Sequence, residues 1–75
     1  MKFTQEIVDK ISDELQHTYC FQDENTIVNT LFPEELDGIE KAIKRYLGDV
    51  HVTFHKLGWF NYDSGYDGYE IKVSE

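Results

Sequence analysis

The sequence is poor in cysteine, proline and basic residues. It has one Cys and one Pro in 75 residues, and seven Lys and Arg against fifteen Asp and Glu. The single cysteine, Cys20, cannot form an internal disulfide, and a small domain without disulfides is typical of a reducing cytoplasm. The first residues also lack the apolar run of a signal peptide. We therefore expect a cytoplasmic protein.

The shortage of basic residues excludes two classes of partner. Proteins hold nucleic-acid phosphates with Lys and Arg, and a chain with a formal charge of −8 has no basic stripe for this purpose. The same charge disfavours an anionic membrane surface. The longest apolar run is Tyr19-Cys20-Phe21, which is far too short to span a bilayer. We therefore expect no direct binding of nucleic acid or membrane.

Motifs for catalysis and for metal binding are also missing. The sequence has no G-x-S-x-G, no H-E-x-x-H and no phosphate-binding glycine loop, so we expect neither an enzyme nor a cofactor. The segment 61–70 is rich in oxygen ligands but lacks the residue order of a calcium-binding EF-hand loop. The candidate zinc ligands are His17, Cys20, His51 and His55. Because His51 and His55 are predicted on a strand, they lie about 13 Å apart, too far to share one zinc ion.

The length allows a single domain, 1–75, and the hydrophobic pattern predicts an α+β fold. Hydrophobic residues make up 40% of the chain, which argues against disorder. Apolar side chains at helical spacing predict helices over 3–17 and 33–47. Pro33 fits the first turn of the second helix, and Gly48 fits its C-terminal cap.

The pattern of the segment between these helices is ambiguous. Residues 18–22 favour a short extended piece, and Asp23-Glu24-Asn25 favours a turn or the start of a helix. In 24–32 the apolar residues recur at helical spacing, whereas the run Thr26-Ile27-Val28 favours a strand. We predict a short helix over 24–32, and a strand is the alternative.

Residues 49–74 predict antiparallel β-structure, because apolar and polar side chains alternate at both ends of this segment. Asp63-Ser64-Gly65 is suited to a three-residue hairpin loop. A plain hairpin around that loop would turn Val52 away from Ile71, so a β-bulge or a second turn is required near Gly58. The fold prediction is thus two or three helices packed on a C-terminal hairpin or a three-stranded meander. The meander would have strands at roughly 49–55, 59–63 and 66–74.

Aromatic residues are concentrated in the C-terminal part of the chain. Five of them lie within the eleven residues 59–69, interleaved with Gly, Asn, Asp and Ser. This composition is typical of binding surfaces, although such rings also cover one face of a small sheet through cross-strand pairs. The aromatic residues that we expect to contact a partner are Trp59, Phe60, Tyr62 and Tyr66.

The carboxylates are numerous and unevenly distributed. The segment 41–45 carries three positive charges, so the remainder of the chain has a net charge of −11. Repulsion at this density costs stability in a small domain, which argues for a role beyond solubility. The carboxylates that we expect to contact a partner are Glu6, Asp9, Asp13, Asp23, Glu24, Glu34, Glu35, Asp63, Asp67 and Glu70.

These features lead to a functional hypothesis. Carboxylates on a rigid scaffold can replace the phosphates of duplex DNA, which carries one charge per about 1.7 Å of its axis. In size, acidity and lack of catalytic motifs the chain resembles the small DNA-mimicking inhibitors encoded by bacteriophages. This resemblance implies a location in the host cytoplasm of a phage-infected bacterium. We predict an acidic, non-enzymatic inhibitor of a basic DNA-binding protein, such as a nucleoid protein, a polymerase, or a restriction or CRISPR component.

A second interpretation assigns the binding surface to the aromatic hairpin. The protein would then be a small structural or regulatory subunit that docks through these rings, and its acidity would serve solubility. A homodimer that pairs through an exposed C-terminal strand edge is compatible with both interpretations.

Overall fold

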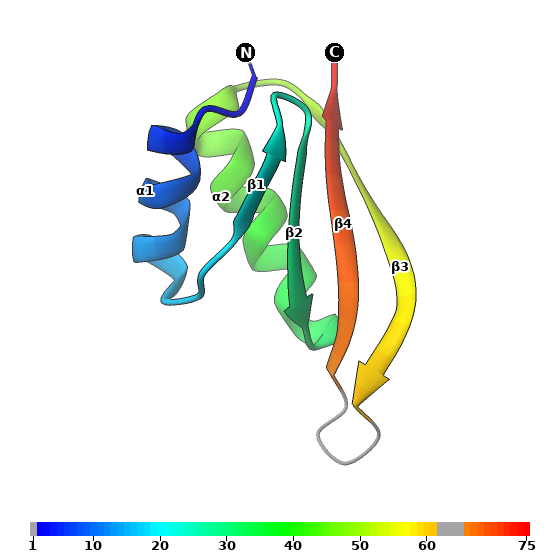
Figure 1. Ribbon diagram of the computed structural model, residues 1–75. Helices are drawn as coiled ribbons and strands as arrows, with labels where there is room; N and C mark the ends of the chain where they lie inside the picture. Colours follow the sequence, from blue (N-terminus) through cyan, green and yellow to red (C-terminus); the bar gives the residue numbers. More distant parts are fainter. Residues whose placement is uncertain (1, 62–65) are drawn as a thin grey trace.

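The computed structural model describes residues 2–61 and 66–75, and for 59–61 and 66 it describes the backbone alone. It confirms the α+β class. The strands form one antiparallel sheet in the order β1-β2-β4-β3, and Figure 1 shows both helices on the side of β1 and β2, with β3 at the opposite edge. The elements are α1 (Gln5–Leu15), β1 (Cys20–Asp23), β2 (Thr26–Leu31), the 3-10 turn η1 (Pro33–Glu35), α2 (Leu36–Leu47), β3 (His51–Asn61) and β4 (Tyr66–Ser74).

Helix α1 is shorter than the predicted helix 3–17. It begins after Thr4, whose side chain accepts a hydrogen bond from the backbone N–H of Ile7 at 3.2 Å, as a capping residue does. It ends at Leu15, because Gln16 adopts the left-handed backbone conformation with φ of 57°. Phe3 therefore precedes the helix, yet it is buried in the core with 2% exposure.

The second predicted helix, 33–47, is confirmed as η1 followed by α2. Pro33 opens η1, where the missing N–H of proline leaves no hydrogen bond unmade. Lys44 and Arg45 lie in the last turn of α2, where their charge complements the helix dipole. Gly48 ends the helix with φ of 81°, a conformation that side chains with a Cβ rarely adopt.

The predicted short helix over 24–32 is wrong, because most of this segment forms strand β2. Ile27 of β2 lies directly opposite Phe21 of β1 and Ile71 of β4. The strand is thus hydrogen-bonded on both edges, and this pairing overrides the helical spacing of its apolar residues. The extended piece predicted at 18–22 is confirmed in β1, and the predicted turn follows it at 24–25.

The C-terminal segment is a single long hairpin with a bulge, so the alternative three-stranded meander is wrong. Strands β3 and β4 pair along their length, with a register shift between Lys56 and Phe60. Gly58 lies in this shift with φ of 81°, the left-handed conformation that glycine provides in a bulge. On the far side of the bulge Phe54 lies opposite Ile71, which is the correction that the sequence pattern required.

Strand β4 is an interior strand of the sheet. It lies between β2 and β3, so the last strand offers no free edge for the predicted dimer, and the dimer itself stays a prediction. A plain hairpin would pair Tyr66 with Tyr62, whereas Tyr66 pairs with Asn61. The predicted loop Asp63-Ser64-Gly65 lies outside the described residues.

The core fills the space between the helices and one face of the sheet. On β4, the buried Tyr69, Ile71 and Val73 alternate with the more exposed Glu70 and Lys72, as expected for a sheet with one covered face. In the described part of the chain, neither helix is long and apolar enough to cross a membrane. The other members of the core are Phe3, Val8, Ile11, Tyr19, Ile27, Leu31, Ile39, Ile43, Leu47 and Val50.

Candidate functional site

Every Lys and Arg of the chain forms an ion pair with a different carboxylate. Most of these side chains are exposed, so each pair contributes little to stability. Together, however, the pairs compensate the charge of each Lys and Arg with an adjacent carboxylate. The basic segment 41–45 therefore forms no basic patch. The pairs are Lys2–Glu24 (3.1 Å), Lys10–Glu6 (3.5 Å), Lys41–Asp37 (3.1 Å), Lys44–Glu40 (3.2 Å), Arg45–Glu14, Lys56–Asp67 (4.0 Å) and Lys72–Glu70 (3.5 Å).

The excess negative charge is left on carboxylates that have no Lys or Arg pair among the described residues. On α1 these are Asp9 and Asp13, and both side chains are exposed. Asp9 accepts a hydrogen bond from the side chain of Gln5 at 2.9 Å. Glu34 in η1 is also exposed, and no Lys or Arg of the described residues pairs with it. The candidate site is therefore an anionic surface.

The structure places the remaining predicted contact residues unevenly. Asp67 points its carboxylate into the protein, with 14% of the side chain exposed, and so offers little surface to a partner. Glu70 lies on the uncovered face of the sheet beside Lys72. Asp63 and the side chains of the predicted aromatic surface lie outside the described residues, namely Trp59, Phe60, Tyr62 and Tyr66.

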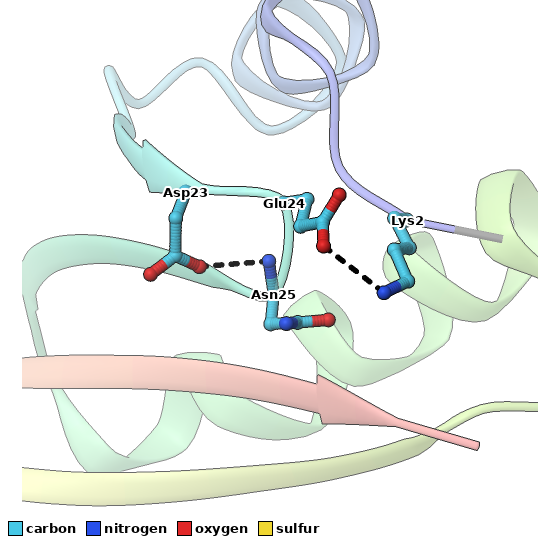
Figure 2. A network of polar contacts seen from close by, with 4 residues as sticks. All are labelled: Lys2, Asp23, Glu24 and Asn25. Carbon is cyan, nitrogen blue, oxygen red and sulfur yellow. Dashed lines mark hydrogen bonds and ion pairs between the residues drawn. The ribbon is translucent and has the colours of Figure 1, made fainter.

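Asp23 shapes the turn between β1 and β2. Figure 2 shows its carboxylate, which accepts a hydrogen bond from the backbone N–H of Asn25 at 2.8 Å. This bond is the main reason why the pKa of Asp23 is lowered, and the side chain of Thr26 and the charge of Lys72 act in the same direction. Asp23 is thus held as a carboxylate that stabilises the turn.

The N-terminal segment is fixed to the same turn. The Lys2 ammonium contacts the Glu24 carboxylate, as Figure 2 shows, and the backbone N–H of Phe3 donates to the carbonyl oxygen of Glu24 at 2.7 Å. A polar hollow of about 540 Å³ lies beside this turn, and its lining includes Lys2, Lys72, Asp23 and Thr53. Both lysines of the hollow already pair with carboxylates, so the hollow offers no uncompensated cation to an anionic ligand.

A second polar cluster joins the end of α1 to the start of α2. His17 Nε2 lies 2.7 Å from Glu35 Oε1, and the other carboxylate oxygen, Glu35 Oε2, accepts a hydrogen bond from the backbone N–H of Phe32 at 2.7 Å. Both oxygens of Glu35 are thus engaged inside the protein, and the contacts support a structural role for this predicted contact residue. A hollow of about 200 Å³ lies here, lined among others by Leu15, Glu34 and Glu35.

Tyr19 belongs to this cluster and is almost fully buried. Its backbone N–H donates to Ser12 Oγ at 3.1 Å, and its hydroxyl is buried without a hydrogen-bond partner in the described residues. Burial, and then the charge of Glu35, raise the pKa of Tyr19 to about 12, and the nearby side chain of Asn29 opposes this shift. Sequence reasoning missed the cluster because its members come from separate segments that only the fold brings together.

We expect Tyr19→Phe to make the protein less sensitive to alkaline pH. The pKa of Tyr19 in the folded chain, about 12, is higher than the usual value near 10. The neutral hydroxyl therefore contributes its full stability below about pH 10, and the contribution is lost as the pH rises from about 10 to 12. Urea unfolding of both chains between about pH 7 and pH 11 measures the difference. An equal loss of stability in the two chains would contradict the prediction.

No family model, curated protein or solved structure matches this chain. Its function must therefore be inferred from its own surface.

Among the described residues, no three His, Cys, Asp or Glu side chains gather closely enough to bind a metal ion. His51 and His55 lie on β3 and are both exposed, in agreement with the strand predicted for them.

Proposed function

We propose that this chain is an acidic interaction protein that occupies the phosphate-binding surface of a basic, DNA-binding partner and inhibits it. The observation that carries this proposal is the pairing of all seven Lys and Arg with carboxylates of the chain itself. Among the described residues, the exposed carboxylates Asp9, Asp13 and Glu34 are therefore left for a partner without a paired Lys or Arg.

The outer face of α1 carries two of these carboxylates, Asp9 and Asp13, together with Glu6, which pairs with Lys10. Glu6, Asp9 and Asp13 are all exposed there, and they span about 10 Å along the helix axis. Duplex DNA presents about six phosphates over that length, so the helix is a sparser array, with Lys10 offsetting part of its charge. Flexible Lys and Arg side chains of a partner can adjust to such spacing, and the summed field steers the encounter.

Glu34 is a separate exposed carboxylate in η1. It lines the small hollow beside Leu15, whereas Asp13 lies about 160° away from Leu15 around α1. We refer to Glu6, Asp9 and Asp13 as the α1 acidic surface. Because a rigid helix holds these groups, little ordering entropy is lost on binding.

The proposal predicts a steep dependence of partner binding on salt. A basic protein captured by this chain from a bacterial lysate should lose at least about tenfold in affinity between roughly 50 and 300 mM salt, because the contacts are ionic and screened. Duplex DNA should compete for the same surface. A partner whose binding is insensitive to salt and to DNA would overturn the proposal.

Charge reversal locates the surface. The double variant Asp9→Lys/Asp13→Lys should abolish capture, whereas Asp37→Lys/Glu40→Lys makes the same change of charge on α2 and serves as the matched control. Circular dichroism establishes that both variants fold. Equal loss of binding in both variants would show that net charge alone matters, and would contradict the assignment to α1.

A further inference from the structure

The sheet has two edge strands, β1 and β3, and they differ in how well they are protected from pairing with another strand. Strand β1 has only four residues, and its pairing is irregular between Phe21 and Asp23. It also runs directly into the acidic pair Asp23-Glu24. Short length, irregularity and charge each discourage the addition of a further strand at an edge.

Strand β3 has little of this protection over the stretch 51–55, which ends before Lys56. Its pairing with β4 is regular there, and the bulge at Gly58 lies beyond it. In the described residues no backbone group pairs with its outer edge. The longer segment 50–62 contains no proline and none of the fifteen acidic residues of the chain, so this edge is the one where a second acidic molecule meets least repulsion.

The side chains of this edge are also incompletely covered. Val52 and Phe54 face the core side of the sheet but are only partly buried against it. In Figure 1 the helices lie on the side of β1 and β2, and β3 stands at the opposite edge. A strand added next to β3 would cover both apolar side chains and hydrogen-bond the free backbone groups.

We propose that the occupant of this edge is a second copy of the same chain, which pairs antiparallel with β3 around a two-fold axis at Thr53. Residues that face each other across an antiparallel pair point to the same side of the sheet. An axis at Thr53 sets Val52 of each copy opposite Phe54 of the other, so two apolar pairs form on the core side. An axis at Phe54 would pair the two Phe54 side chains with each other but set each Val52 opposite Lys56, so only one apolar pair would form.

Net charge sets the expected response of the dimer to salt. Two copies together carry a charge of −16, twice the −8 of one chain, and salt screens the repulsion between their distant acidic surfaces. Dimerisation should therefore strengthen as salt rises, whereas binding of a basic partner should weaken. The two processes are thus distinguishable in the same series of buffers.

Disulfide trapping tests the register. In a Cys20→Ser background, Thr53→Cys places two thiols opposite each other at the axis, within the range that a disulfide can bridge. Thr30→Cys on β2 is the control, because Thr30 is equally exposed on the same face of the sheet but far from the edge. Under mild oxidation we expect Thr53→Cys to form covalent dimers at least about ten times faster than the control.

Sedimentation of the unmodified chain tests the dimer itself. We expect a reversible monomer–dimer equilibrium whose dissociation constant increases at least about tenfold in Val52→Lys, since both apolar pairs are lost, and much less in Val28→Lys on β2. Equal cross-linking of the two cysteine variants, or a wild-type chain that is purely monomeric at roughly 100 μM in high salt, would overturn the proposal.

Discussion

Phe3→Ala is expected to lower the free energy of unfolding by about 3–5 kcal/mol, the range for removal of a buried phenylalanine ring. The ring of Phe3 is 2% exposed and belongs to the core, and its backbone N–H is bonded to Glu24. Small domains have only about 5–15 kcal/mol of stability in total. The variant should therefore lose a large fraction of its stability and unfold at a clearly lower urea concentration than the unmodified chain.

Phe21→Ala is the matched control for this experiment. Phe21 lies on β1 with 37% of the residue exposed, so its truncation removes less buried area and should cost less than half as much. Urea unfolding followed by circular dichroism measures both variants. Similar losses for the two phenylalanines would show that the segment before α1 does not contribute to the core.

The second large effect is expected at Ile71 in the central strand. Ile71 is fully buried and lies between Ile27 of β2 and Phe54 of β3. Both neighbours are fixed by strand pairing, so the space left by Ile71→Ala cannot close. We expect a loss of about 2–5 kcal/mol, including the cost of the cavity, and a smaller loss of about 0.5–1.5 kcal/mol for Ile71→Val.

Leu57→Ala supplies the control on the same hairpin, because Leu57 is 37% exposed next to the bulge. Its truncation should change stability by well under half of the value for Ile71→Ala. Thermal and urea unfolding of the three variants measure these differences. If Ile71→Ala cost no more than Leu57→Ala, β4 would not be the centre of a packed sheet.

The acidic residues of the candidate site could be read from the sequence, but their charge partners only in part. Asp37 and Lys41 are four residues apart on a helix, and this spacing alone predicts their contact. The pair of Glu14 with Arg45 spans 31 residues, and no local pattern indicates it. Consequently, the fold was needed to show that every basic side chain is neutralised and which carboxylates remain for a partner.

Local sequence signals were sufficient to predict the two helices, including Pro33 at the start of one and Gly48 at its end. Helical hydrogen bonds and caps join residues a few positions apart, so their signals are local. Two features could be seen only in the folded chain: the segment 26–31 is a strand, and β4 lies in the interior of the sheet. Strand pairing joins distant segments, and the choice depends on the partner that a strand finds. Here Ile71 of β4 lies opposite Ile27 of β2. The free energy gained by burying this pair outweighs the helical spacing of the apolar residues in the segment.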